Sequence, residues 1–264
     1  MFYTVKELVE QSHAFSSVAE LMVHTEVENS TRTEAQIRHL MSRNLEVMER
    51  SVKEGIAGVK SVTGLTGGEA KKLNHYIADD RFMSGKPIME AVRNAVAVNE
   101  VNAKMGLICA TPTAGSAGVL AGVLLAMRDR LHLTHDQQLD FLFTAGAFGL
   151  VIANNAGIAG AEGGCQEEVG SASAMAAAAL VCDPVAGLVE VPCVKRNALG
   201  ASQAMISADM ALAGCISVIP ADEVIEAVNR VGMQLPATLR ETGEGGLATT
   251  PTGLRLKEQI FGKK

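Results

Sequence analysis

Hydrophobic positions recur at helical intervals along most of the chain. Between residues 34 and 54, apolar side chains return every three or four positions, and charged residues fill the positions between them. Thr31, with Glu34 three residues later, has the spacing of a capping box. The pattern predicts one long amphipathic helix with apolar positions at Ile37, Leu40, Met41, Leu45, Met48 and Val52.

The same periodicity predicts further helices along the chain. They are expected near residues 5–12, 15–28, 69–79, 87–104, 116–130, 136–153, 168–181, 198–213, 221–233 and 251–261. Strand-like alternation is nearly absent, and the single candidate, LVEVPCV, contains Pro192, which is unsuited to a central strand. No repeat of solenoid length recurs, and no long linker divides the chain. The sequence therefore predicts one compact all-α domain over residues 1–264.

Composition and charge exclude several classes of function. The net charge is -6, Lys and Arg are scattered, and two Tyr with no Trp offer few stacking surfaces, so no nucleic-acid partner is expected. The nearly apolar runs AGVLAGVLLAM and FLFTAGAFGLVIA are shorter than the ~18 residues of a membrane helix. They predict buried helices and no membrane association. The opening MFYTVKELVEQ lacks an apolar signal core, so a cytoplasmic location is expected.

Four glycine-rich turns with polar neighbours each precede a predicted helix. Glycine lets backbone N–H groups face a ligand, and a helix N-terminus adds positive potential, so such turns suit a carboxylate or phosphate. Taken singly, each is more often a plain turn or helix cap. Together they favour a small anionic ligand. The turns are TGLTGGEA (63–70), TPTAGSAG (111–118), NNAGIAGAEGGCQ (154–166) and ETGEGGLATTPTG (241–253).

Three of the five cysteines are expected at the edges of helices. Cys165 follows a Gly-Gly turn, Cys182 precedes Asp-Pro, and Cys193 follows a proline, and such fixed backbone suits metal ligands. The alternative is that a free cysteine is a small buried apolar residue, which fits Cys109 and Cys215. The wide intervals between the three argue against a zinc knuckle and suit an iron–sulfur cluster, whose irons need ligands on different sides.

Several long motifs resemble the α chain of the iron–sulfur-dependent L-serine dehydratases. They are TPTAGSAGV, GGCQEEVGSASAMAAAAL, CDPVAGLVEVPCVKRNALGASQAMISADMALAG and ETGEGGLATTPTG, and the resemblance runs from VKEL near the start to IFG near the end. It implies a lyase of amino-acid degradation and gluconeogenesis that converts L-serine to pyruvate and ammonia. It also implies a [4Fe–4S] cluster in place of pyridoxal phosphate, held by Cys165, Cys182 and Cys193.

One segment departs from the family pattern. Relatives carry a further helical segment between the Ala-rich helix and the CDPVAG motif, whereas AAAALVCDP joins the two directly here. The chain is therefore either shortened between residues 181 and 182, or residues are missing from the sequence at that point.

The resemblance also implies how the substrate is held. Expelling hydroxide from serine needs a Lewis acid, and three thiolates on four irons leave one iron without a protein ligand. The glycine-rich turns would then hold the substrate carboxylate and ammonium, although each polar residue there is equally suited to capping a helix. The candidates are Thr66, Gly67, Gly68, Thr111, Thr113, Gly115, Ser116, Asn154 and Asn155.

A general base is the missing part of this site. None of the six histidines lies in a motif that suggests proton abstraction. The resemblance implies a partner β chain that supplies a histidine, and the chain stops at IFGKK without the terminal cysteine of single-chain relatives. Two other hypotheses remain: a pyridoxal-phosphate dehydratase, which needs a Schiff-base lysine and normally an α/β scaffold, and a helical scaffold protein with incidental thiols.

Overall fold

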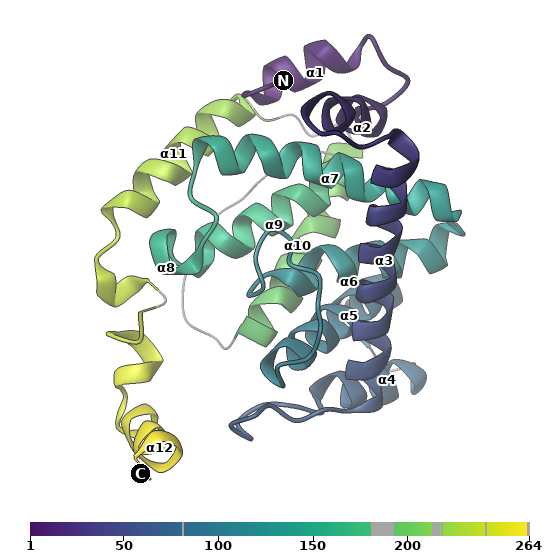
Figure 1. The fold of residues 1–264 in the computed structure, drawn as a ribbon. Helices are drawn as coiled ribbons and strands as arrows, with labels where there is room; N and C mark the ends of the chain where they lie inside the picture. Colours follow the sequence, from purple (N-terminus) through teal and green to yellow (C-terminus); the bar gives the residue numbers. More distant parts are fainter. Residues whose placement is uncertain (81, 181–192, 213–216, 218, 241, 263–264) are drawn as a thin grey trace.

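The computed structural model describes residues 1–80, 82–180, 193–212, 217, 219–240 and 242–262, and within these ranges it contains helices and turns but no β-strand (Figure 1). The prediction of an all-α fold is confirmed. The helices are α1 (Val5–Ser12), α2 (Val18–Asn29), α3 (Glu34–Ala57), α4 (Glu69–Ala78), α5 (Lys86–Ala103), α6 (Ala117–Leu131), α7 (His135–Asn155), α8 (Gly160–Gly163), α9 (Cys165–Leu180), α10 (Cys193–Leu212), α11 (Ala221–Gln234), the 3₁₀ turns η1 (Ala237–Leu239) and η2 (Gly246–Thr249), and α12 (Pro251–Phe261).

The long amphipathic helix is α3, and its capping box differs from the prediction. The Thr33 hydroxyl accepts the N–H of Gln36, and the Gln36 side chain accepts the N–H of Thr33, so the box lies two residues beyond the predicted pair. Most of the predicted apolar positions face the protein. Leu40 is the exception, with 40% of its surface exposed. The apolar stripe is therefore narrower than the sequence pattern suggested.

Two helices begin earlier than predicted, and both begin at a cysteine. Helix α9 starts at Cys165 and helix α10 at Cys193, whereas the sequence placed these starts at 168 and 198. No glycine or proline interrupts the chain between Cys193 and Asn197, so a helix can form directly after Pro192. The short helix α8 was not predicted, because four residues carry no periodic signal.

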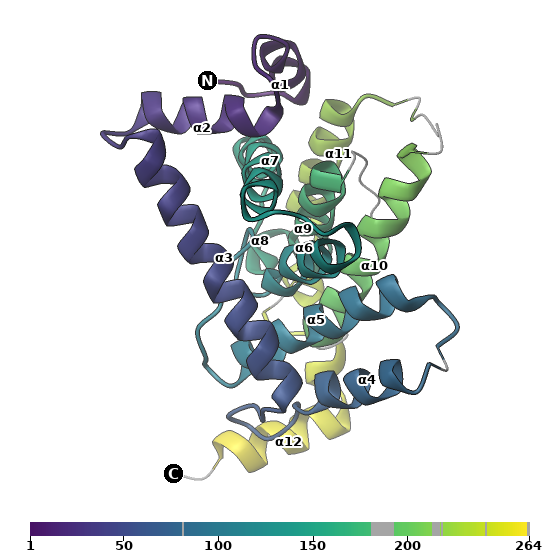
Figure 2. The same ribbon diagram turned by 90° about the vertical axis from the view of Figure 1, so that its right-hand side faces the viewer.

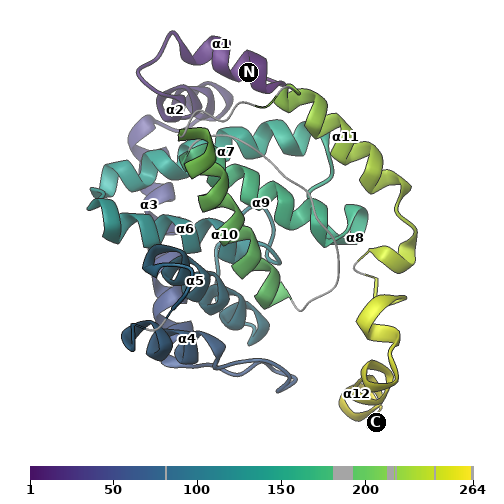
Figure 3. The same ribbon diagram turned by 180° about the vertical axis from the view of Figure 1, so that it is seen from behind.

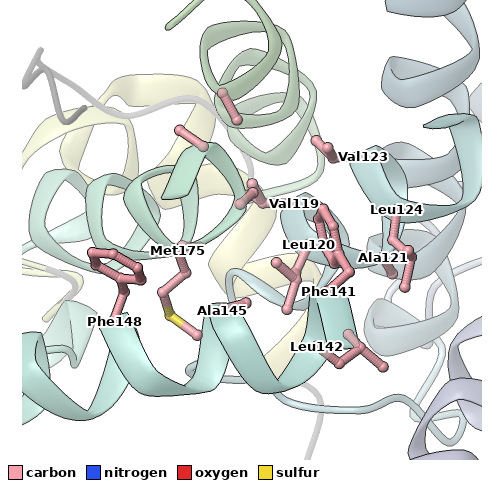
Figure 4. Close-up of a cluster of buried hydrophobic side chains, with 14 of the residues drawn as sticks. Val119, Leu120, Ala121, Val123, Leu124, Phe141, Leu142, Ala145, Phe148 and Met175 are labelled. Atoms are coloured by element: carbon pink, nitrogen blue, oxygen red, sulfur yellow. The ribbon is translucent and has the colours of Figure 1, made fainter. Parts of the chain in front are cut away.

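The core lies where helices α5, α6, α7, α9 and α10 pack together, and α3 crosses one side of it (Figure 2). Side chains of α6, α7 and α9 fill the centre, including Leu120, Phe141 and Met175 (Figure 4). Small residues allow the helices to approach closely: a Cβ on Gly118 of α6 would collide with the carbonyl oxygen of Ala95 on α5. The two apolar runs form the buried parts of α6 and α7, as predicted.

The C-terminal segment runs along one side of this core. Helix α11 packs on α7, α8 and α9, while η1, η2 and α12 continue away from the central helices (Figures 1 and 3). Among the described residues, no helix is long and apolar enough to cross a membrane.

Candidate functional site

The turn before α6 is organised by its own hydroxyl groups. The Ser116 and Thr113 hydroxyls are 2.9 Å apart, and Ser116 Oγ lies 3.3 Å from the carbonyl oxygen of Thr111. The Thr111 hydroxyl donates to the carbonyl oxygen of Ala117 at 3.4 Å, and the Thr111–Pro112 peptide bond is cis. Four of the predicted substrate-binding residues, Thr111, Thr113, Gly115 and Ser116, therefore lie together on one ordered turn.

Helix α9 contributes a buried carboxylate to this turn. Glu168, in the first turn of α9, has 5% of its surface exposed and accepts a hydrogen bond from the Thr113 hydroxyl. A Cβ on Gly115 would lie 2.6 Å from Glu168 Oε1, so a larger residue there would have to displace the carboxylate. Burial raises the pKa of the Glu168 carboxyl, and the hydrogen bond from Thr113 opposes that rise.

Helices α10 and α5 hold the same turn through amide side chains. Asn197, the fifth residue of α10, donates from Nδ2 to the carbonyl oxygen of Gly115 at 2.7 Å. Asn102, near the C-terminal end of α5, donates to the carbonyl oxygen of Ala114 at 3.0 Å. The starts of α6, α9 and α10 thus meet at Gly115. Because each helix N-terminus carries positive potential, this meeting point favours an anionic group.

Two of the three predicted cluster ligands begin helices that meet there. Cys165 precedes Glu168 by three residues on α9, and Cys193 precedes Asn197 by four on α10. Cys182 and Cys215 lie outside the described residues. Cys109 is a half-buried free thiol whose pKa is raised by burial. No group of three His, Cys, Asp or Glu side chains suited to a metal was found in the described part of the chain.

The turn at 154–166 packs against Glu167, the residue before Glu168 on α9. Glu167 has 3% of its surface exposed and packs against the glycines of this turn, since a Cβ on Gly157 or Gly163 would meet its carboxylate. A Cβ on Gly232 of α11 would lie 2.7 Å from Oε2 of the same carboxylate. Two of the four predicted turns thus converge on the first turn of α9.

At the turn at 63–70, a side chain of the protein takes the position that an anionic ligand would need. Glu100 of α5 is fully buried and accepts the N–H groups of Glu69 at 2.6 Å and Ala70 at 3.4 Å, at the start of α4. Gly67 has a φ of 134°, and a Cβ there would collide with the carbonyl oxygen of Val59. A substrate role for Thr66, Gly67 and Gly68 stays a prediction.

The remaining candidates lie elsewhere. Asn155, the last residue of α7, donates to the carbonyl oxygens of Tyr3 at 2.6 Å and Val151 at 2.8 Å, which ties the N-terminal segment to α7. Asn154 is exposed. In the described part of the predicted turn at 241–253, the Thr242 hydroxyl donates to the carbonyl oxygen of Ala237 in η1. These contacts give Asn155 a structural role, and its predicted role in substrate binding is untested.

Sequence reasoning missed the buried polar residues that organise the site. Glu167 and Glu168 are consecutive carboxylates at the start of a helix that otherwise carries no charge, and that contrast was the available signal. Glu100 and Asn197 gave no comparable signal, because each lies on a helix with ordinary polar neighbours.

Comparisons with known proteins identify the family of this chain. A family model described as "Serine dehydratase alpha chain" matches residues 14–181 and 179–248. The "Probable L-serine dehydratase, alpha chain" of Bacillus subtilis is 55% identical over 288 aligned positions, which cover 99% of this chain and 96% of the relative. The "L-serine dehydratase, alpha chain" of Peptoniphilus asaccharolyticus is 37% identical and covered over 99% of both chains.

Longer relatives match with part of their length. The "L-serine dehydratase" of Mycobacterium tuberculosis is 35% identical over 84% of this chain, but the match spans 55% of that relative. The chain is therefore similar to the whole of the relatives named alpha chain and to about half of this longer one.

Proposed function

This chain belongs to the serine dehydratase alpha-chain family, and from that membership we propose that it is the alpha chain of an L-serine dehydratase, a lyase that converts L-serine to pyruvate and ammonia. One structural observation indicates which residues would form the active site. The starts of α6, α9 and α10 meet at Gly115, and α9 and α10 both begin at a cysteine. The dipoles of three helix N-termini can stabilise the negative charge that develops when a hydroxyl group departs from the substrate.

We propose a [4Fe–4S] cluster as the cofactor. Cys165, Cys182 and Cys193 would hold it, since thiolates are the usual ligands of such clusters, and the positive ends of three helices favour its negative charge. When bound, the cluster supplies Lewis acidity for the departure of the serine hydroxyl group. A protein with reduced thiols that acts on a small amino acid would be suited to the cytoplasm.

The chain's own residues hold the substrate and keep it in place. The turn at 111–116 is held from α9 by Glu168 and from α10 by Asn197, so its position is tied to the starts of both helices. A serine molecule bound at this turn would keep a constant position relative to both cysteines. Such fixed placement is how an enzyme reduces the entropic part of a reaction barrier.

We propose that a partner β chain supplies the base for the α-proton. All six histidines of this chain are exposed. His135 Nε2 lies 3.1 Å from the Ser42 hydroxyl of α3, and His24 is paired with Glu28 one turn later on α2. The relatives that align along their whole length are named alpha chain, while the longer relatives carry additional length in a single chain.

The apparent shortening belongs to the proposal as well. The family match falls into two pieces that meet near residue 181, and the alignment with the Bacillus relative has 288 positions for a chain of 264 residues. We place the shortening between residues 181 and 182. Intact mass spectrometry of the purified chain would test it, because a chain with additional residues would exceed the mass of the printed sequence.

An anaerobic reconstitution tests the function. The purified chain should contain iron and sulfide and should turn over L-serine slowly, and adding the β chain should raise the rate. Chain without iron or sulfide would support a scaffold protein instead. An absorption band altered by borohydride would support pyridoxal phosphate, and full activity without β would show that the base lies in this chain.

A further inference from the structure

Two consecutive carboxylates at the start of α9 face different parts of the molecule. Glu167 lies among the glycines at 157, 163 and 232, whereas Glu168 lies under the turn at 111–116. Both side chains are more than nine-tenths buried. Glu168 Oε1 accepts from Thr113, while Glu168 Oε2 is buried and has no hydrogen-bond partner among the described residues.

The hydroxyl protons of the turn can be assigned by counting. When Glu168 is ionised, its carboxylate accepts hydrogen bonds and cannot donate them, so the Thr113 hydroxyl donates its only proton to Glu168. Thr113 Oγ1 can then only accept from Ser116, whose proton goes either to it or to the Thr111 carbonyl oxygen. The Thr111 proton goes to the carbonyl oxygen of Ala117. All three hydroxyl protons are therefore directed to protein acceptors.

Several backbone donors of the turn are also used. The N–H of Thr111 donates to the carbonyl oxygen of Thr113 at 3.2 Å, that of Ser116 donates to the Thr113 hydroxyl at 3.4 Å, and that of Ala117 donates to the carbonyl oxygen of Ala114 at 3.4 Å. The N–H groups of Thr113, Ala114 and Gly115 have no acceptor among the described residues. The unsatisfied side-chain group beside the turn is an acceptor, Glu168 Oε2, which carries negative charge when Glu168 is ionised.

A buried carboxylate oxygen without a partner is costly, and a cation is the partner that offsets the cost best. L-serine carries one cation, its α-ammonium group, and one anion, its carboxylate. We propose that Glu168 makes the turn at 111–116 the subsite for the α-ammonium group of L-serine. This inference rests on the proposed function, and it gives the glycine-rich turn a cationic ligand group where the sequence pattern suggested an anionic one.

The test separates the two charges of the substrate. The cluster-loaded chain with its β chain is titrated calorimetrically with ethanolamine, which has the ammonium and hydroxyl groups, and with 3-hydroxypropionate, which has the hydroxyl and carboxylate groups. Glu168→Gln keeps the shape of the side chain and removes its charge. We expect the Kd for ethanolamine and the KM for L-serine to rise about ten- to a hundredfold. The Kd for 3-hydroxypropionate should change less than about twofold.

Two further variants keep the test decisive if Glu168→Gln fails to fold or to retain iron. Thr113→Val removes the hydroxyl that links the turn to Glu168, and we expect the same selective loss of ethanolamine binding. Thr113→Ser restores the hydroxyl and should restore the binding. Asp140→Asn is a control that removes a carboxylate paired with Arg38 between α7 and α3. It should leave the affinities for both ligands unchanged.

Three results would overturn the inference: equal weakening of both ligands by Glu168→Gln, unchanged ethanolamine binding in Glu168→Gln and Thr113→Val, or wild-type protein that binds 3-hydroxypropionate and not ethanolamine. Failure of the proposed function gives a different result. In that case the complex, loaded with iron and sulfide, would not turn over L-serine, whatever the two ligands do in calorimetry.

Discussion

The turns at 63–70 and 111–118 both combine threonine with glycine before a helix, and both lie at the C-terminal end of α5. Their partners differ. The N-terminus of α4, after the first turn, is filled by the carboxylate of Glu100, which accepts two of its N–H groups. The turn before α6 is instead held from α9 and α10, by Glu168 and Asn197, and the start of α6 has no side-chain cap.

The difference shows how a protein can supply its own anion at a helix start. A glycine-rich helix start attracts negative charge wherever it occurs. At α4 the attraction is satisfied internally and contributes to the fold. At α6 the nearby carboxylate comes from a helix that begins with a predicted cluster ligand, so the turn is tied to the site. The same sequence signature therefore serves a structural role in one place and a candidate binding role in the other.

The largest effect is expected from the cysteines at the start of α9 and α10. Cys165→Ser or Cys193→Ser should remove iron and serine turnover together, because each would remove one proposed ligand beside the turn at 111–118. Iron analysis and initial rates measure the two losses. Cys109→Ser is the matched control and should keep both. Full iron and full turnover in Cys193→Ser would contradict the ligand assignment.

Alanine at the two key glycines should separate binding from stability. Gly115→Ala places a Cβ against the Glu168 carboxylate, so we expect a raised KM for L-serine. Gly67→Ala places one against the Val59 carbonyl at a φ of 134°, so we expect a loss of about 2–5 kcal/mol of unfolding free energy. Urea denaturation and steady-state kinetics measure the two effects. The same loss of stability in both variants, with no change in KM, would show that the two turns are equivalent.

Two asparagines give a smaller contrast. Asn197→Ala leaves the Gly115 carbonyl oxygen without its donor, and we expect a loss of about 1–3 kcal/mol together with a raised KM. Asn155→Ala removes the link between α7 and Tyr3, so its effect should fall mainly on stability. Kinetics on both variants decides the matter. A larger rise in KM for Asn155→Ala would place the substrate near the end of α7 instead.

The smallest effect is a change in the pH dependence of stability at Glu100. Burial raises the pKa of this carboxyl in the folded protein, against the hydrogen bonds from the start of α4. The unfolded chain ionises first, so the folded state loses stability from this group as the pH rises from about 4.5 through the folded-state pKa. Glu100→Gln should flatten the dependence of Tm on pH over that range. Parallel Tm profiles for the two proteins would contradict this.

The sequence predicted most of the fold. The positions of α1, α4, α6 and α12 agree with the prediction within about two residues, because the spacing of apolar residues that defines a helix is local. The starts of α9 and α10 were placed too late, because the polar residues after each cysteine hid the first turn. Cys165 and Cys193 lie at the edges of helices, as predicted, and each is the first residue of its helix.

The site was predicted only in part, for a physical reason. Residue type and spacing suggested the turn at 111–116 and the cysteines that follow it along the chain as candidates, and their roles stay predictions. Whether a turn meets a ligand or a protein side chain depends on contacts between distant positions, such as Thr113 with Glu168 and Gly115 with Asn197, which are 55 and 82 residues apart. Helix periodicity acts over three or four residues, so the sequence by itself determined the helices and the chemical types of the side chains. The packing of α5, α6, α9 and α10 decided which of those side chains meet, because burial brings together groups that no local spacing relates.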